Sequence, residues 1–380
     1  MKFMHISDLH IGKQVNGYSM IEDQRYILKS ILREVDKEDV DGVLIAGDVY
    51  DKSVPSAEAV TVLDDFLVSL AKKIKPVFII SGNHDSAERL SFGGRLFEAQ
   101  NIYLSPVYQG EVRCITMEDE YGEVNVYLLP FVKPTQVKGF LKEEEDRITD
   151  YSSAIAAVID HMNVDTTKRN ILVMHQFVTG AVRCDSEEVS VGGLDQVDGS
   201  ILKDFDYVAL GHIHGPQKVG RENIRYCGTP LKYSLSEVNH KKSVTIVELK
   251  EKGELILQEI PLIPKRDMYH LRGTYGELSS LNYYKGQEFQ NGYVHITLTD
   301  EEDILEVKGR LQTIYPNLMS VEYDNQRTRS TLNLQASEEV EKKSPLELFE
   351  NLYEQQNNQE LTKEQVEILL PMIESIWGEE

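Results

Sequence analysis

Gly82-Asn83-His84-Asp85 is the stretch that decides the fold, and it follows the apolar run Val77-Phe78-Ile79-Ile80. The run predicts a buried strand, so the tetrapeptide should lie at the carboxyl end of that strand. There it brings together an amide oxygen, an imidazole and a carboxylate, which bind metals or transfer protons. Glycine, asparagine and aspartate are also common in turns, so the stretch by itself could equally be an ordinary turn.

An apolar run followed by residues able to bind a metal occurs at four other places. These are Met4-His5-Ile6 with Asp8 and His10, Val43-Leu44-Ile45-Ala46 with Asp48 and Asp51, Ile171-Leu172-Val173-Met174 with His175, and Val208-Ala209-Leu210 with His212 and His214. In open α/β sheets, ligands bind outside the carboxyl ends of the strands, so five such ends can converge on one site. Five coincidences of this kind favour a metal centre over unrelated turns.

The composition is that of a soluble globular protein, with 41% hydrophobic and 27% charged residues in a chain long enough for two or three domains. No apolar run approaches membrane-spanning length, and the first expected strand leaves no room for a signal peptide. Cys114, Cys184 and Cys227 have no metal-ligand spacing. We expect them to be free thiols of a reduced, cytoplasmic protein.

The formal net charge of −23 constrains the substrate. A protein that binds nucleic acid unaided usually presents a basic surface. Either the substrate is small, or bound metal ions and a partner protein supply much of the attraction. The charge leaves both alternatives open.

Apolar residues recur at helical spacing in residues 21–35, 56–73 and 154–162, and the second of these stripes includes Val60. Alternating strands and helices predict an α/β domain. Residues 224–227 and 243–247 are expected strands with no helix between them. They predict an added antiparallel part, so the sheet should be mixed or doubled.

A first domain should span residues 1–265, because Ile-Pro-Leu-Ile-Pro-Lys interrupts the pattern at its end. Residues 266–330 predict a small α+β domain with strands at 293–298 and 319–323. Its helix should open with a capping box formed by Thr299 and Glu302.

A polar linker should span residues 331–343, and two amphipathic helices should occupy residues 344–380. Ser344 with Glu347 and Thr362 with Gln365 form capping boxes, and Pro371 should kink the second helix. These helices should dock either on the chain's own body or on a partner.

The predicted ligands comprise three oxygen donors and four imidazoles, which exceed the needs of one ion. We predict one ion held by Asp8, His10 and His214, a second held by Asn83, His175 and His212, and Asp48 as the bridge between them. Mixed nitrogen and oxygen ligands suit Mn²⁺, Fe or Zn²⁺. Two such ions, about 3.5–4 Å apart, stabilise the attacking and leaving oxygens of a phosphoryl displacement.

His84 remains outside this ligand set. We predict that it stabilises the transition state or protonates the leaving oxygen. Asp85 is grouped with His84 as catalytic, and we expect Asp85 and Asp51 to orient their neighbours.

These motifs resemble a known family. Asp8-x-His10, Gly47-Asp48-x-x-Asp51, Gly82-Asn83-His84-Asp85, His175 and Gly211-His212-x-His214 are similar to the signature of the calcineurin-like metallophosphoesterases. The context His5-Ile6-Ser7-Asp8-Leu9-His10-Ile11-Gly12 and the stretch Ser344-Pro345-Leu346-Glu347-Leu348-Phe349 resemble the SbcD family of bacterial nuclease subunits. The resemblance covers nearly the whole chain, and no ligand position departs from the pattern.

The resemblance implies a β-sandwich flanked by helices, with residues 266–330 as a capping domain. It further implies a Mn²⁺-dependent exo- and endonuclease that acts on double-stranded DNA ends and hairpins in repair and recombination. The expected partners are the SbcC ATPase, bound by the C-terminal helices, and a second nuclease subunit, which together form a heterotetramer. Two other interpretations remain: a phosphodiesterase for small nucleotides at the same site, and a non-catalytic scaffold, which would usually have lost ligands.

Overall fold

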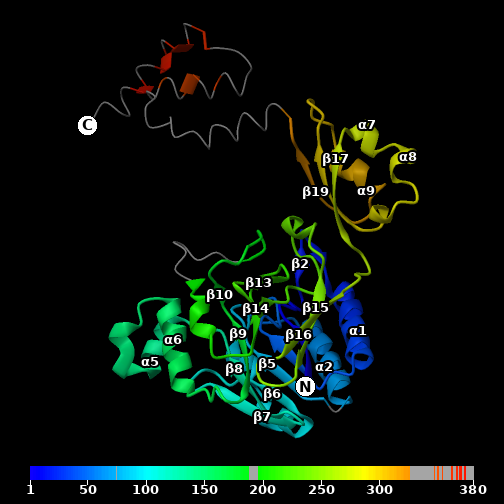
Figure 1. The fold of residues 1–380 in the computed structure, drawn as a ribbon. Coiled ribbons are helices and arrows are strands. Elements are labelled where there is room, and N and C mark those ends of the chain that lie inside the picture. Colours follow the sequence, from blue (N-terminus) through cyan, green and yellow to red (C-terminus); the bar gives the residue numbers. More distant parts are fainter. Residues whose placement is uncertain are drawn as a thin grey trace. The chain divides into compact units, whose positions relative to one another are not determined.

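The structure, a computed structural model, describes residues 1–73, 75–187 and 196–325. It also describes residues 346, 349–350, 353, 361–362, 365–366, 368–369 and 372–373. The chain divides into two compact units, Met1–Met268 and Tyr269–Glu380 (Figure 1). The boundary predicted from the sequence lies after residue 265.

The first unit is a sandwich of two six-stranded sheets. The first sheet has the order β16-β15-β1-β4-β5-β6. Its strands are β1 (Lys2–Ile6), β4 (Gly42–Ala46), β5 (Val77–Ile80), β6 (Ile102–Leu104), β15 (Ser243–Leu249) and β16 (Leu255–Pro261). Strands β1, β4, β5 and β6 are parallel, whereas β15 is antiparallel to β1 and β16 is antiparallel to β15.

The second sheet has the order β13-β14-β12-β9-β8-β7. Its strands are β7 (Arg113–Asp119), β8 (Gly122–Leu129), β9 (Arg169–His175), β12 (Tyr207–Gly211), β13 (Gln217–Val219) and β14 (Arg221–Tyr226). The four central strands are parallel, and β7 and β13 pair antiparallel at the two edges. The predicted antiparallel addition is therefore present in both sheets, although β14 itself runs parallel to β12.

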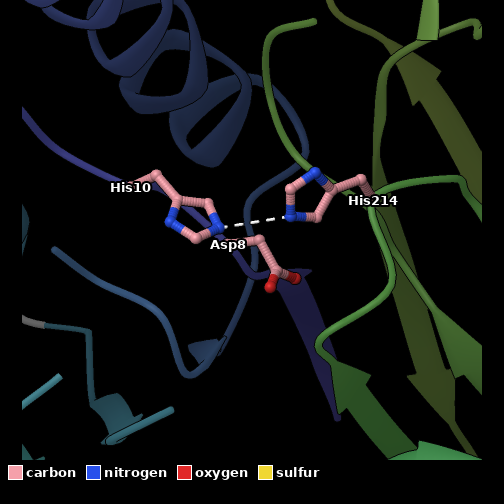
Figure 2. A group of neighbouring side chains, drawn as sticks. All are labelled: Asp8, His10 and His214. Carbon is pink, nitrogen blue, oxygen red and sulfur yellow. Dashed lines mark hydrogen bonds between the residues drawn. The ribbon is translucent and has the colours of Figure 1, made fainter. Parts of the chain in front are cut away.

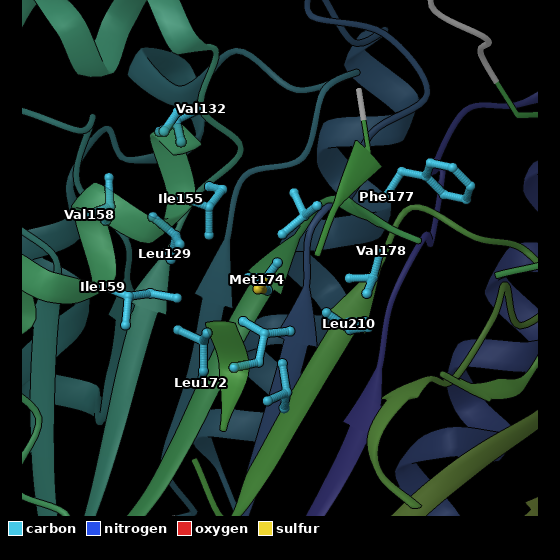
Figure 3. Packing of buried hydrophobic residues seen from close by; sticks show 14 of the residues in the cluster. Leu129, Val132, Ile155, Val158, Ile159, Leu172, Met174, Phe177, Val178 and Leu210 are labelled. Carbon is cyan, nitrogen blue, oxygen red and sulfur yellow. The ribbon is translucent and has the colours of Figure 1, made fainter. Parts of the chain in front are cut away.

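Hydrophobic side chains fill both faces of the second sheet because successive residues of a strand point to opposite sides. Ile171 and Val173 of β9 join the core between the sheets, where Phe78 and Leu44 of the first sheet also lie. Leu172 and the other residues labelled in Figure 3 form the core on the opposite face, beneath α6 (Tyr151–Met162). Burial on both faces explains why these strands read as continuous apolar runs in the sequence.

Helices cover the two outer faces of the sandwich. Figure 1 shows α1 (Ile21–Lys37) and α2 (Ala57–Ala71) on one side of the strands and α5 (Pro134–Phe140) and α6 on the other. The remaining elements of the unit are short. They are β2 (Gln14–Val15), β3 (Tyr18–Ser19), α3 (Ala87–Leu90), α4 (Gly94–Phe97), η1 (Glu98–Gln100), η2 (Lys142–Arg147), β10 (Phe177–Val178), β11 (Gln196–Val197), η3 (Gly199–Leu202) and η4 (Leu235–Glu237).

The three helices predicted for this unit are all present, with two corrections. Val60 does not belong to the buried stripe of α2: its side chain is 45% exposed, and Val62 takes the buried position. Helix α6 begins three residues earlier than predicted because Asp150 caps it. The Asp150 carboxylate accepts a hydrogen bond from the Ser153 amide, which satisfies one of the free donors of the first turn.

The second unit contains a three-stranded sheet with the order β17-β18-β19, covered by short helices. Its elements are β17 (Met268–Gly273), α7 (Tyr275–Leu278), α8 (Leu281–Tyr284), η5 (Glu288–Gln290), β18 (Tyr293–Leu298), α9 (Val307–Gln312) and β19 (Leu318–Tyr323). Both strands predicted here are present, and they pair in parallel.

The predicted capping box of Thr299 and Glu302 is wrong, because α9 begins only at Val307. The intervening backbone is held by other partners. Asp300 accepts a hydrogen bond from the Tyr275 amide, and the Ile304 amide donates to the Tyr323 hydroxyl. These tertiary contacts hold the segment in bends and a turn in place of a first helical turn.

The capping box of Thr362 and Gln365 is present in the C-terminal region. The Gln365 backbone amide donates to the Thr362 hydroxyl at 3.3 Å, and the Thr362 backbone amide donates to the side-chain Oε1 of Gln365 at 2.9 Å. The Gln365 side chain also donates to the Tyr353 hydroxyl. The predicted linker at 331–343, the Ser344 cap and the kink at Pro371 lie outside the described residues.

The α/β sandwich flanked by helices is confirmed, as is the α+β character of the described part of the second unit. None of the described helices is long and apolar enough to cross a membrane.

Candidate dinuclear metal centre

The predicted site residues converge at the carboxyl ends of five parallel strands. Asp8 and His10 follow β1, Asp48 follows β4, Asn83 follows β5, His175 ends β9, and His212 and His214 follow β12. Backbone hydrogen bonds join the first two loops, from the Asp8 amide to the Gly47 carbonyl and from the His10 amide to the Asp48 carbonyl. The two sheets thus contribute to a single site.

The Asp48 carboxylate occupies the centre of the cluster. Its Oδ2 lies 3.3 Å from His175 Nε2, 3.7 Å from His10 Nε2 and 3.9 Å from His84 Nε2. Its Oδ1 accepts a hydrogen bond from the His84 amide at 2.9 Å. One oxygen of Asp48 therefore faces histidines from both halves of the site, as a bridging ligand must.

Asn83 lies between two histidines of the second sheet. Its Oδ1 is 3.0 Å from His175 Nε2 and 3.0 Å from His212 Nδ1. The other nitrogen of His175, Nδ1, donates to the Ala46 carbonyl at 2.8 Å, so Nε2 is the nitrogen that points at Asn83 and Asp48 and that would bind an ion on losing its proton. These contacts bring together the three residues predicted to hold one ion.

Asp8, His10 and His214 form the second group, shown in Figure 2. The Nε2 atoms of His10 and His214 face one another at 3.2 Å. Asp8 accepts hydrogen bonds from the His212 amide and from the Ser7 hydroxyl, which aim its carboxylate into the site. All three side chains are buried.

Four of the predicted ligands have positive backbone φ angles: 51° at Asp8, 43° at His10, 46° at Asp48 and 104° at His212. Residues other than glycine seldom adopt this region, and such strain persists only where the surrounding structure enforces it. The strand ends are therefore bent to direct side chains into the site.

The Gly211 Cα packs against the hydrogen bond that orients His175. A Cβ at this position would collide with the Ala46 carbonyl oxygen and would lie 2.6 Å from His175 Nδ1. At Gly82, a Cβ would collide with the Asp48 carboxylate. Glycine is required at Gly211 because the end of β12 approaches β4 of the other sheet, and at Gly82 because the loop after β5 approaches the loop after β4 in the same sheet.

Burial dominates the electrostatics of the site. It raises the pKa of Asp8 to about 6, and it lowers the pKa of His212 to about 3 and that of His10 well below its ordinary value. Burial also opposes ionisation of Asp48 and His175, but their mutual attraction outweighs it. The pKa of Asp48 is held well below its usual range, and that of His175 rises to about 9.

His84 differs from the fully buried histidines, because 19% of its side chain is exposed. Its Nδ1 donates to the Asp51 carbonyl at 3.1 Å, which leaves Nε2 directed towards the site. Asp51 itself pairs with Lys13 at 2.8 Å and lies 3.8 Å from His10 Nδ1.

The Asp85 carboxylate is occupied by backbone donors. Oδ2 accepts from the amides of Val49 and Gly82, and Oδ1 accepts from the amide of Tyr50. Asp85 thus joins the loop after β5 to the loop after β4. This arrangement favours the orienting role over direct participation in catalysis.

Comparisons with known proteins agree with this geometry. The family model of the calcineurin-like phosphoesterases matches residues 1–216, and that of the type 5 capsule protein repressor C-terminal domain matches residues 264–357. Two curated relatives are both described as the D subunit of the nuclease SbcCD. The protein from Staphylococcus epidermidis is 32% identical over 372 residues, and that from Staphylococcus saprophyticus subsp. saprophyticus is 30% identical over 374 residues; each match covers 96% of both chains.

The chain belongs to the SbcD family of calcineurin-like phosphoesterases. Two solved structures are similar at a lower level. A dimetal phosphatase from Danio rerio matches with a TM-score of 0.40 and 13% identity, over 69% of this chain and 96% of that chain. The protein TT1561 of Thermus thermophilus matches with a TM-score of 0.35 and 12% identity, over 68% of this chain and 98% of that chain.

The phosphoesterase family uses a dinuclear divalent metal site, and the donor set fits one. Atoms that could bind an ion lie close together: Asp48 Oδ2 is 3.3 Å from His175 Nε2, and the Nε2 atoms of His10 and His214 are 3.2 Å apart. Two nitrogen ligands on one ion, with bonds of about 2.1 Å, lie about 3 Å apart, as His10 and His214 do. Buried charges of this kind require pairing or a metal ion.

Sequence reasoning missed the residues that support the ligands from behind. Gln24 donates to the His10 carbonyl at 2.7 Å and to the Tyr233 hydroxyl at 3.0 Å, which holds the loop after β1. Glu237 and Ser186 lie against His214. No periodicity or spacing marks these residues, because they come from unrelated segments that meet only in the folded chain.

Gly211→Ala should destabilise the first unit by about 1–3 kcal/mol, the usual cost of overpacking, and lower its melting temperature by several degrees. The added methyl group would meet the Ala46 backbone and the buried His175 ring, and neither can move freely. Calorimetry measures the shift. The control is Gly139→Ala, since a Cβ at that position meets nothing within 4 Å beyond its chain neighbours and the backbone of its own helix. Equal melting temperatures for the two variants would contradict the crowding argument.

Proposed function

We propose that this chain is the nuclease subunit of a complex with an SbcC ATPase, hydrolysing phosphodiester bonds at double-stranded DNA ends and hairpins in repair and recombination. The observation that carries the proposal is the convergence of seven metal-binding side chains at the ends of five strands. Full-length similarity to two proteins described as the D subunit of the nuclease SbcCD gives the substrate class and the partner.

In this proposal, Asp8, His10 and His214 hold one ion, Asn83, His175 and His212 hold the other, and Asp48 bridges both. The close approaches within each group support this division. The mixture of oxygen and nitrogen donors supports Mn²⁺ as the ion, since softer thiolate ligands are absent from the seven residues.

When bound, the two ions would activate water and neutralise charge that develops on the phosphoryl group. The chain's own contribution is positioning. The Asp48 carboxylate keeps the two halves of the site in register, and the Ala46 carbonyl fixes the His175 tautomer. His84 is partly exposed, whereas the four predicted histidine ligands are buried. It directs Nε2 towards the site, where it stabilises the transition state or protonates the leaving oxygen.

Partners supply what the acidic chain lacks. With a net charge of −23, the subunit would depend on its metal ions and on SbcC for part of its affinity for DNA. Phe349, Ile368 and Met372 in the C-terminal region are exposed apolar residues that suit docking on SbcC. A homodimer within a heterotetramer and a cytoplasmic location complete the proposal.

A phosphodiesterase for small nucleotides could use the same metal centre. The match of residues 264–357 to a second family model weighs against it, because a small substrate gives no reason for that region. A non-catalytic scaffold is disfavoured because every predicted ligand is present and directed into the site.

Asp48→Asn should weaken binding of both Mn²⁺ ions and abolish hydrolysis, since one oxygen faces ligands of both groups. Metal analysis counts the ions. Hydrolysis is measured in Mn²⁺ on end-labelled duplex DNA, with and without SbcC, and on a small chromogenic phosphodiester. Asp206→Asn is the matched control, because this largely buried carboxylate pairs with Lys252 at the opposite end of β12. Two full equivalents of metal in Asp48→Asn would refute the bridging role. Faster turnover of the small diester than of DNA with SbcC would favour the alternative function.

His84→Ala should retain both Mn²⁺ ions while the rate falls by roughly 10²–10⁴, the usual contribution of a positioned acid–base group. Single-turnover hydrolysis and metal analysis on the same preparation separate the two effects. His161→Ala provides the control, because this histidine lies on α6 and its side chain is 44% exposed. Loss of an ion from His84→Ala would make His84 a ligand.

Deleting residues 340–380 should abolish retention on immobilised SbcC while leaving Mn²⁺-dependent cleavage of a small phosphodiester intact, because no predicted ligand lies there. The double variant Phe349→Asp/Ile368→Asp should likewise lose its retention on SbcC and keep its cleavage of the small phosphodiester. Leu305→Asp, at another exposed apolar residue, is the matched control and should still bind. If the helices dock instead on the chain's own body, the truncated protein would melt several degrees lower, as loss of about 1 kcal/mol or more would cause, and would still bind SbcC.

A further inference from the structure

A closed polar network lies behind His214, on the side away from His10. The Nδ1 atom of His214 is 2.8 Å from Ser186 Oγ and 3.2 Å from Glu237 Oε1. The Ser186 hydroxyl in turn donates to Glu237 Oε1 at 2.6 Å. Glu237 is fully buried and His214 is 2% exposed, so water does not substitute for these contacts.

The charge of Glu237 is balanced from the opposite side by Lys242. The Lys242 ammonium donates to Glu237 Oε2, and it also donates to the His214 carbonyl at 2.9 Å and to the Thr229 hydroxyl at 2.6 Å. Lys242 is 6% exposed. A buried carboxylate is retained only where it is paired and hydrogen-bonded, and both oxygens of Glu237 meet that condition.

These contacts decide which nitrogen of His214 carries the proton. An ionised carboxylate can only accept hydrogen bonds, and the Ser186 hydroxyl uses its single proton on Glu237. Nδ1 must therefore be the protonated nitrogen, and Nε2 keeps the lone pair that faces His10 Nε2 at 3.2 Å.

His214 differs in this respect from the other predicted histidine ligands. His175 donates to a neutral carbonyl of the backbone, that of Ala46. His212 uses Nδ1 to face Asn83. His10 Nδ1 has no hydrogen-bond partner within the part of the chain that the structure describes, and the Asp51 carboxylate lies 3.8 Å from it, beyond hydrogen-bond distance. A carboxylate behind an imidazole raises its basicity as a metal ligand and holds the ring in place.

We infer that Glu237 is a positioning residue that fixes the tautomer and orientation of His214, with Ser186 as its relay and Lys242 as its counter-ion. It thereby supports selectively the ion held with Asp8 and His10. The inference rests on the proposed dinuclear centre and extends it to three residues outside the ligand set. It predicts that loss of Glu237 weakens the binding of one ion and leaves the binding of the other unchanged.

The test is a calorimetric titration of metal-free protein with Mn²⁺ in the absence of substrate. Glu237→Gln should weaken one of the two binding events by about 10–100-fold, the usual effect of removing a partner of a ligand, and leave the other unchanged. Glu237→Gln/Lys242→Met should give the same result. This double variant removes the charge pair together, so it keeps the comparison available should an unpaired Lys242 prevent folding of the single variant.

Asp206→Asn is again the matched control. Asp206 is a largely buried carboxylate paired with a lysine and with the Asn170 amide, but it precedes β12 whereas His214 follows that strand. The Asp206→Asn variant should have a lower melting temperature than the wild-type protein, and both of its Mn²⁺ affinities should stay at the wild-type values. The inference would be overturned if the Glu237 variants bound both Mn²⁺ ions with wild-type affinity, or if both affinities fell equally. A wild-type protein that binds fewer than two ions would overturn the dinuclear centre itself.

Discussion

The hydrogen bond from the His175 imidazole to the Ala46 carbonyl is the interaction on which the rest of the site depends. It joins the end of β9 in one sheet to the end of β4 in the other, at 2.8 Å and out of contact with water. The glycines at 47, 82 and 211 all pack closely around His175 and Asp48. A Cβ at any of the three positions would collide with His175, Asp48 or the Ala46 carbonyl and disturb the predicted ligands.

The site also concentrates charge that a protein interior does not tolerate unaided. Asp8, Asp48 and several imidazoles are buried within a few ångströms of each other. Without a cation, the Asp48–His175 attraction balances part of this charge, which raises the pKa of His175 to about 9 despite its burial. Two divalent ions would take over that balance, so the same burial that strains the free site favours the loaded one. Four of the predicted ligands also have strained, positive φ angles, which the surrounding structure enforces.

The central strands could be predicted from the sequence because they are buried on both faces. Continuous apolar runs marked β1, β4, β5, β9 and β12, and the polar residues after each run marked the site. Prediction was weaker where partners from elsewhere in the chain intervene. Val60 fits the apolar spacing of α2 but faces solvent, and the capping box expected at Thr299 is displaced by hydrogen bonds from Tyr275 and to Tyr323. Helical periodicity and capping are local signals, whereas these outcomes depend on neighbours distant in sequence.

The sequence by itself determined the five strands that end at the site, helices α1, α2 and α6 of the first unit, the chemistry available at each of those strand ends and the family to which the chain belongs. It did so because apolar periodicity and strand-end residues are local properties of the chain. Only the tertiary structure decided which nitrogen of each histidine faces the site, that Asp85 is occupied by three backbone amides, and that Glu237 lies behind His214. These features arise where segments tens to more than a hundred residues apart meet, and no local pattern records the distance or direction of such an encounter.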